Sequence, residues 1–353
     1  MLPSKWKVEN VTAASPLQEK RFMATPICDL GLKLTDEPLN ELITEFRREL
    51  ERIGIRRLKP DFYLSTEWGV PFESISIGIP FYLAQSALVD VHAQIVGHLE
   101  GVGRAELLRY LRHEMGHVVN YAYRLYEEAE WIELFGSMTQ PYLEEYSPEP
   151  FSQRFVWHLP GWYAQKHPDE DWSETFAVWM TPGREWRAVY ANWPDALAKL
   201  EYCDRTMAIL NERDPLVTAT DHDEDVSSLT ATLEDFYRAH PAAGDELLPP
   251  DLDGALQVIF EDFNSPENHA TDAPRRSAGE LILKLERDLV ANVYRWTGHF
   301  PEMTRRLVQH MAARAGAMQQ VYPADHESSA TVAVTTLVTS LAMNHVLRGR
   351  YLQ

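Results

Sequence analysis

Apolar side chains recur at helical spacing in three segments of the first half of the chain. In Pro38–Ile53 they fall on one side and charged residues on the other, which predicts an amphipathic helix. Residues Arg104–Tyr126 carry a buried apolar stripe and are the most strongly helical part of the sequence. A shorter helix is predicted over Asp171–Met180, where Thr181-Pro182-Gly183 ends it.

Two short segments between the first two predicted helices have the character of strands. Phe62–Ser65 is mainly apolar, and Ser74–Pro80 alternates apolar with small residues at period two. The order helix, strand, strand, helix predicts an α+β domain with a small mixed sheet. The second strand, Ile75–Ile79, is a candidate edge along which an extended peptide could add, and its alternation fits an ordinary core strand equally well.

The composition changes after Leu210, where the chain becomes acidic and poor in apolar residues. This change predicts a boundary. We expect a first domain over residues 1–212, an acidic linker over 213–228, and a mostly helical carboxy-terminal domain of unknown role over 229–353.

Three helical patterns fill the carboxy-terminal part, at Glu280–Trp296, Met303–Gln320 and Ser329–Arg348, after a polar break at Asn264–Ser277. The longest apolar stretch, Ala330–Met343, is shorter than a bilayer requires and predicts a buried helix. Because the amino terminus lacks the apolar core of a secretory signal, a cytoplasmic protein without a membrane partner is expected.

Composition narrows the classes of partner. The chain has 353 residues, of which 45% are hydrophobic, so substantial cores are expected. The formal net charge of -20 offers no basic surface for a nucleic acid. The two cysteines, Cys28 and Cys203, stand in no metal-binding spacing.

A candidate metal site lies inside the long predicted helix. His113 and His117 are four residues apart, which places both imidazoles on one face of a helix, as two ligands of one zinc ion require. Glu114, beside the first histidine, can act as general base on a water that the metal activates. Gly116 stands where a β-carbon could crowd an opposing element.

A catalytic zinc usually takes a third protein ligand and leaves one position for water. Glu170 and Glu174, again four residues apart, lie on the next predicted helix. One of these carboxylates can bind the metal, and the other can accept the outer N–H of a ligand histidine. The acidic residues Asp169–Asp171 are also typical of the first turn of an ordinary helix. Asp171 and Asn120 are further candidates for orienting a histidine.

These segments resemble known zinc peptidases. The motif His113-Glu114-Met115-Gly116-His117, followed by Glu170 and Glu174, resembles the gluzincin arrangement. Tyr163 lies seven residues before Glu170, as in peptidases of the lethal-factor type. Roughly the first 180 to 210 residues are similar to a bacterial zinc-binding metallopeptidase family, a resemblance that also rests on Ser65–Gly69 and Gly78–Ala84.

The resemblance implies a zincin-like fold, with His113, His117 and Glu170 as zinc ligands and Glu114 as base. It places Glu174 behind the ligands, and it gives Tyr163 the role of stabilising the oxyanion. An alternative alignment makes Glu174 the ligand, but it leaves Val178 where a carboxylate belongs.

The function expected from the sequence is zinc-dependent hydrolysis of peptide bonds in a peptide or protein substrate. One alternative is a zinc amidase that acts on an isopeptide or a cell-wall amide. Another is a zinc-site binding protein without turnover, which the presence of Glu114 disfavours.

Overall fold

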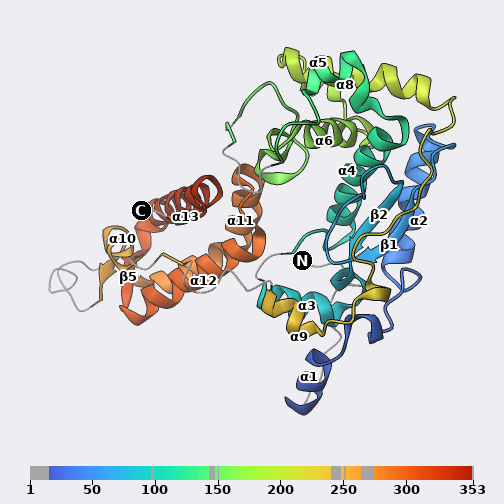
Figure 1. Ribbon diagram of the computed structural model, residues 1–353. Helices are drawn as coiled ribbons and strands as arrows, with labels where there is room; N and C mark the ends of the chain where they lie inside the picture. Colours follow the sequence, from blue (N-terminus) through green and yellow to red (C-terminus); the bar gives the residue numbers. More distant parts are fainter. Residues whose placement is uncertain are drawn as a thin grey trace. The chain divides into compact units, whose positions relative to one another are not determined.

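The computed structural model describes residues 16–96, 99–142, 148–149, 151–239, 248–249, 252–263 and 274–351. The fold is α+β and mostly helical, with small sheets, which confirms the fold class expected from the sequence (Figure 1). The chain divides into two compact units at residue 240.

The first unit contains helices α1 (Pro16–Met23), α2 (Leu39–Arg52), α3 (Ser86–Ile95), α4 (Arg104–Tyr123), α5 (Ala129–Phe135), α6 (Pro168–Met180), α7 (Trp186–Val189), α8 (Pro194–Leu210) and α9 (Leu233–Ala239). The helices predicted over Pro38–Ile53 and Arg104–Tyr126 correspond to α2 and α4. Helix α4 ends at Tyr123 because Arg124 adopts a left-handed conformation with φ 52°.

Helix α6 begins earlier than the predicted Asp171, at Pro168. Proline suits the first helical position because the missing N–H has no partner there. The ring of His167 then acts as the amino-terminal cap, since its Nδ1 accepts a hydrogen bond from the backbone N–H of Asp169 (3.2 Å). The whole acidic run Asp169–Asp171 therefore lies inside the first turn of the helix.

The sheet of the first unit has two parallel strands, β1 (Asp61–Ser65) and β2 (Ser76–Pro80). On the other side of β2, the backbone N–H of Gly78 donates to the carbonyl of Gly69 (2.8 Å) in an antiparallel bridge. All five residues of β2 are buried. Of the two interpretations of Ile75–Ile79, the core strand is therefore confirmed and the open edge is wrong at Gly78, where the chain itself occupies the pairing position.

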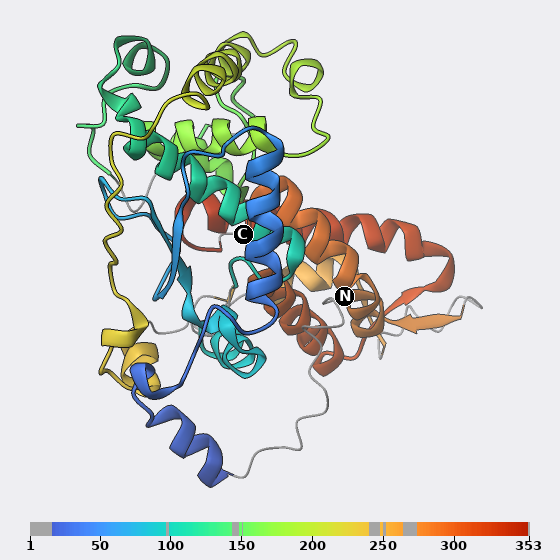
Figure 2. The same cartoon turned by 90° about the vertical axis from the view of Figure 1, so that its right-hand side faces the viewer.

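The acidic segment predicted as a linker over residues 213–228 belongs to the first unit. It runs as extended chain beside the strands (Figure 2). The backbone N–H of Ile75 donates to the carbonyl of Ala219 (2.9 Å), and His222 Nε2 lies 2.8 Å from Asp61 Oδ2. The predicted boundary is wrong because this segment is held by hydrogen bonds and ion pairs, which a low apolar content does not reveal.

Helices α4 and α6 pack against each other at a position without a side chain. A β-carbon on Gly116 would lie 2.6 Å from the Cα atom of Ser173. The indole N–H of Trp172 donates to the carbonyl of Gly116 (2.8 Å) across the same contact. The glycine therefore allows the two helices with the candidate metal ligands to approach closely, as the sequence suggested.

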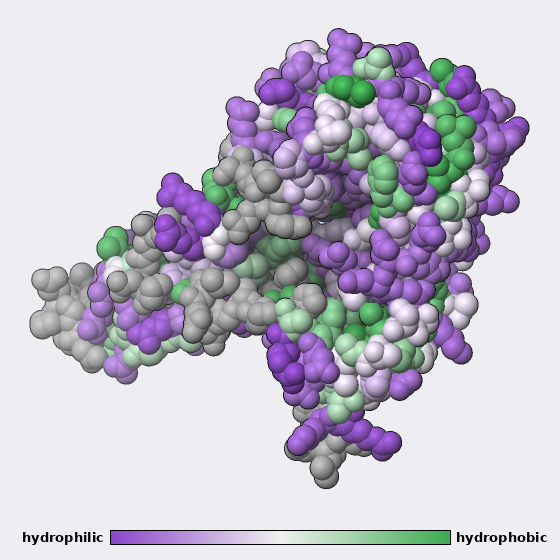
Figure 3. Space-filling model, in the orientation of Figure 1, coloured by the Kyte–Doolittle hydropathy of each residue, from purple (hydrophilic) through white to green (hydrophobic). Residues whose placement is uncertain are grey.

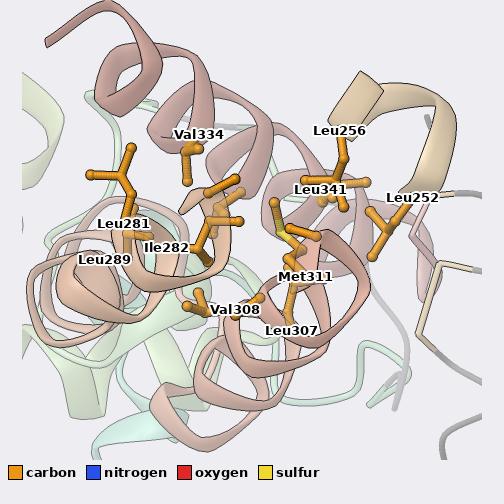
Figure 4. Packing of buried hydrophobic residues seen from close by; sticks show 14 of the residues in the cluster. Leu252, Leu256, Leu281, Ile282, Leu289, Leu307, Val308, Met311, Val334 and Leu341 are labelled. Carbon is orange, nitrogen blue, oxygen red and sulfur yellow. The ribbon is translucent and has the colours of Figure 1, made fainter. Parts of the chain in front are cut away.

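The second unit contains α10 (Leu252–Ile259), α11 (Ala278–Thr297), α12 (Pro301–Ala317) and α13 (Glu327–Arg348), with strands β3 (Glu261–Asp262), β4 (Arg275–Ser277) and β5 (Gln320–Pro323). The strands form an antiparallel sheet in the order β3-β5-β4. Figure 4 shows leucine, isoleucine and valine side chains of α11, α12 and α13 that point toward one another, with Leu252 and Leu256 of α10 beside them.

The three helices predicted in this unit correspond to α11, α12 and α13. Helix α12 ends at Ala317 rather than at Gln320, because Gln319 adopts a left-handed conformation with φ 51° and Gln320 begins β5. Of the predicted polar break at Asn264–Ser277, residues 264–273 lie outside the described part of the chain, and Arg275–Ser277 form β4.

Helix α13 is longer and more exposed than the predicted buried stretch Ala330–Met343. Its buried face includes Ala330, Val334 and Val338, whereas Val332 is 66% exposed. By length and composition, Ala324–Arg348 could cross a membrane, and 28% of its most apolar window is buried. The expectation of a fully buried helix is therefore wrong: one face packs in the core and the other does not.

Candidate metal centre

Two helices bring the predicted ligands together. Helix α4 carries His113 and His117, and the first turn of α6 carries Glu170. The Nε2 atoms of the two histidines lie 3.2 Å apart, and Glu170 Oε2 lies 3.0 Å from the first and 3.3 Å from the second. All three residues are buried, and together they could hold a metal ion.

Glu174, one helical turn after Glu170, lies behind the first histidine. Its Oε1 is 2.8 Å from Nδ1 of His113. Its Oε2 accepts hydrogen bonds from the backbone N–H groups of His158 (3.1 Å) and Leu159 (2.7 Å). Glu174 therefore fixes the ring of His113 from the outer side, whereas Glu170 is the carboxylate that faces both histidines.

A carboxylate that the sequence analysis did not select orients the second histidine. Asp169 Oδ2 lies 2.9 Å from Nδ1 of His117, and the hydroxyl of Tyr121 donates to the same oxygen (2.5 Å). The amide of Asn120 donates to Oδ1 (2.7 Å). The four-residue spacing of His117 and Tyr121 places these two on one face of α4, but it does not point to Asp169, which lies 52 residues after His117.

Asp171 does not orient a histidine, so the role predicted for it is wrong. Its Oδ2 lies 2.6 Å from Nζ of Lys199 on α8, and both side chains are buried. Consecutive residues of a helix point about 100° apart, so Asp169 and Asp171 point away from each other by roughly 160°. Asp171 therefore stabilises the packing of α6 on α8 instead.

Glu114 lies beside the candidate ligands and faces a cavity. Within the described part of the chain, its carboxylate accepts no hydrogen bond, although the residue is only 4% exposed. The cavity has a volume of about 310 Å³. Its walls include the aromatic side chains of Trp68, Tyr121, Tyr142 and Tyr163, the apolar side chains of Val70 and Met138, and the three candidate ligands.

Tyr163 is placed over the site by an unusual stretch of backbone. The short helix η5 (Pro160–Gln165) contains two successive left-handed residues, Gly161 (φ 77°) and Trp162 (φ 55°). For Trp162 this conformation costs roughly 1–2 kcal/mol. As a result, the ring of Tyr163 lies 5.5 Å from that of His113, measured between centroids.

Tyr142 is a further site residue that the sequence analysis did not identify. Its hydroxyl donates to Glu170 Oε1 (2.7 Å) and lies 3.4 Å from the hydroxyl of Tyr163. The ammonium of Lys166 stands over both rings, 4.3 Å from the centroid of Tyr142 and 5.3 Å from that of Tyr163. No spacing motif connects residue 142 with Glu170, so only the folded chain reveals this contact.

Burial and the surrounding charges shift several pKa values at the site. Burial alone lowers the pKa of His113, but Glu170 and Glu174 outweigh it and raise that pKa to about 9. Burial raises the pKa of Glu114, an effect that the two histidines oppose. Burial also raises the pKa of Tyr163, and the charge of Glu170 adds to the rise. The phenol of Tyr163 therefore keeps its proton at neutral pH.

Comparison with protein-family models, with curated proteins and with solved structures finds no match to this chain. The arguments about function therefore rest on the geometry of the site and on its chemistry. The face of the molecule in Figure 3 is mainly hydrophilic over the first unit, in keeping with the high content of charged residues.

Proposed function

We propose that this protein is a zinc-dependent hydrolase, most consistent with a peptidase, in which His113, His117 and Glu170 hold the metal. The spacing of the three ligand atoms supports this proposal best. Tetrahedral coordination with bonds of about 2.0–2.1 Å requires neighbouring ligand atoms roughly 3.3 Å apart. The three observed separations are 3.0, 3.2 and 3.3 Å.

The outer surroundings of the histidines add a second argument for a metal. Each Nδ1 atom faces a carboxylate, Glu174 for His113 and Asp169 for His117, so each Nε2 is left as the inward-facing atom. Two Nε2 atoms 3.2 Å apart cannot both carry a proton on the line between them. A shared cation satisfies both nitrogens and the Glu170 oxygen at once.

A zinc ion in this site would lower the pKa of a water molecule and polarise a carbonyl group. Glu114 is the proton acceptor in our proposal, because its carboxylate faces the cavity beside the ligands and accepts no hydrogen bond from the described residues. A pKa raised by burial makes it a better acceptor than an exposed glutamate. It would then deliver the proton to the leaving nitrogen.

Tyr163 is the proposed donor to the oxyanion. Its phenol lies at the cavity, keeps its proton at neutral pH and, in the described part of the chain, makes no hydrogen bond with Glu170. A preorganised donor of this kind stabilises charge that develops during the reaction. A zincin-like fold and kinship with gluzincin peptidases belong to this proposal, and the order of the two ligand-bearing helices supports them.

Peptide bonds are the proposed target. Aromatic and apolar side chains, among them Trp68, Val70 and Met138, line the cavity together with the candidate ligands, and this mixture suits the polar backbone and a side chain of a peptide. An isopeptide or a cell-wall amide would undergo the same chemistry, so both are included among the substrates to be tested. A cytoplasmic location remains part of the proposal.

The decisive experiment combines metal analysis with a single substitution. The purified protein should contain about one zinc per chain and should cleave members of a peptide library. Glu114→Gln should retain zinc and lose activity by roughly 10²–10⁴-fold. Glu106→Gln, on the same helix and partly exposed, is the matched control and should keep full activity.

Three outcomes would contradict the proposal. A protein that binds no zinc with its histidines intact would exclude the metal centre. Full activity in Glu114→Gln would exclude this residue as the base. Zinc binding without cleavage of any peptide, isopeptide or cell-wall amide would favour the binding protein without turnover.

A further inference from the structure

The two oxygens of the candidate ligand Glu170 have different surroundings. Oε2 faces the Nε2 atoms of His113 and His117, at 3.0 and 3.3 Å. Oε1 points away from them and accepts a hydrogen bond from the hydroxyl of Tyr142 (2.7 Å). One oxygen of the carboxylate thus faces the metal position, and the other accepts a hydrogen bond from a phenol.

This division matters because a carboxylate can bind a metal through one oxygen or through both. With both oxygens bound, Glu170 would fill the position that a catalytic site leaves open for water or substrate. A phenol bonded to Oε1 keeps that oxygen turned away.

We propose that Tyr142 is a positioning residue that restricts Glu170 to coordination through Oε2 alone. This inference rests on the proposed metal centre and extends it. Tyr142 holds the carboxylate so that one coordination position stays free, and it takes no part in the transfer of protons.

The segment that carries Tyr142 is tied to the same helix end as Glu170. Gln140 accepts a hydrogen bond through its carbonyl from Nε2 of His167, the cap of α6 (3.1 Å). The rings of Tyr142 and His167 lie 5.4 Å apart, and Lys166 stands 4.3 Å over the phenol ring. Phenol and carboxylate are therefore held against one common element, the start of α6.

The two phenols at the site have separate roles in this arrangement. Tyr142 donates its proton to Glu170, so that proton is not available for an oxyanion. Among the described hydrogen bonds, none joins Tyr163 to Glu170, and the hydroxyl of Tyr142 lies 3.4 Å from that of Tyr163. Tyr163 can therefore donate to substrate while Tyr142 holds the ligand.

The test uses Tyr142→Phe in the full chain, loaded with Co²⁺ in place of zinc. Tyr142 is 47% exposed, and phenylalanine keeps its ring, so the variant should fold with an unchanged melting temperature in the absence of metal. The wild type should show the intense visible bands of four-coordinate Co²⁺. In Tyr142→Phe the second oxygen can bind, so the bands should weaken severalfold, as in five-coordinate Co²⁺.

Two further variants make the result specific. Tyr202→Phe removes a phenol that donates to a carboxylate outside the set of candidate ligands, Glu128 (3.1 Å), and should leave the cobalt spectrum unchanged. Tyr142→Gln restores a hydrogen-bond donor without a phenol and should recover part of the four-coordinate spectrum. Recovery by the amide would identify the hydrogen bond, rather than the ring, as the cause.

The outcomes separate this inference from the proposed function. An unchanged cobalt spectrum in Tyr142→Phe, with Co²⁺ bound as tightly as in the wild type, would overturn the role of Tyr142 and leave the metal centre intact. A wild type that takes up no Co²⁺ or zinc would overturn both. A spectrum that changes equally in Tyr202→Phe would also overturn the inference.

Discussion

Nδ1 of His117 lies 2.9 Å from Oδ2 of Asp169, the residue directly before the candidate ligand Glu170. The first turn of α6 thus supplies, in adjacent positions, a carboxylate that faces both inner nitrogens and one that holds an outer nitrogen. Adjacent residues of a helix point about 100° apart. Asp169 and Glu170 can therefore reach different nitrogen atoms of the histidines on α4. The same turn also contains Asp171, which points to the other side.

This relationship predicts that Asp169 and Asp171 differ sharply in their effect on metal binding. Asp169→Ala removes the acceptor behind His117 and should weaken zinc binding by about 10–100-fold. Asp171→Asn should leave the zinc affinity unchanged, but it should lower the melting temperature, because Lys199 loses a buried counter-charge. Competition with a chelator measures the affinity, and an equal loss in both variants would contradict the assignment.

The contact between α4 and α6 at Gly116 leads to a second prediction. In Gly116→Ala the new β-carbon would lie 2.6 Å from Cα of Ser173, so the helices must move apart. We expect a loss of about 1–3 kcal/mol in the free energy of unfolding, despite the better helix propensity of alanine. Zinc affinity should fall as well, because the separated helices carry the ligands.

Gly254→Ala on α10 is the matched control, since no atom of the described residues lies within 4 Å of a β-carbon there. It should stabilise the protein by up to about 1 kcal/mol. Denaturant unfolding of both variants measures the difference. A Gly116→Ala protein as stable as the wild type would show that the contact between Gly116 and Ser173 is not closely packed.

Zinc affinity should depend on pH through the histidines. Glu170 and Glu174 outweigh burial and raise the pKa of His113 to about 9 in the metal-free site. Burial lowers the pKa of His117, but Asp169 and Glu170 outweigh it and raise that pKa well above its usual value. Metal must displace the protons of both histidines, so the zinc affinity should fall as the pH decreases through about 9 and below. Glu174→Gln removes one of the carboxylates that raise the pKa of His113, so it should give a weaker site whose loss of affinity from protonation of His113 begins at a lower pH. A chelator titration at several pH values measures both, and an affinity independent of pH would contradict the prediction.

The second unit should lose stability in acid through His299. This residue is 1% exposed; its Nδ1 lies 2.7 Å from the hydroxyl of Thr304, and its Nε2 lies 2.8 Å from that of Tyr351. Burial, and then the neighbouring His345, lower its pKa to about 3. As the pH is lowered, the unfolded chain therefore takes up the proton at a higher pH than the folded chain does. The contribution of the neutral His299 to the free energy of unfolding is complete above about pH 6.5, and it is lost as the pH falls toward 3.

His299→Gln keeps hydrogen-bonding groups but cannot titrate in this range, so its stability should depend less on pH than that of the wild type. The exposed His326→Gln is the control and should behave as the wild type does. Urea unfolding of the full chain at several pH values, followed by hydrogen exchange at α11 and α12, measures the effect. Equal pH profiles for all three proteins would rule out His299 as the cause.

The sequence by itself determined the parts of this protein that depend on regular spacing. Helical periodicity placed α2, α4, α11 and α13 within a few residues of their observed bounds. The four-residue spacing of His113 and His117, and of Glu170 and Glu174, brought out four residues that the structure gathers at one site. Spacing suffices there because positions four apart share one face of a helix whatever surrounds it.

Only the tertiary structure decided which residues contact each of these helix faces. The order of Asp169, Glu170 and Asp171 does not reveal which carboxylate meets a histidine, because that depends on which side of α6 packs against α4 and which against α8. The same holds for the acidic segment that binds beside β1, and for the phenol of Tyr142 on Glu170. These contacts join residues that are distant in sequence, so no local pattern encodes them, and only the packed chain brings their atoms within hydrogen-bonding distance.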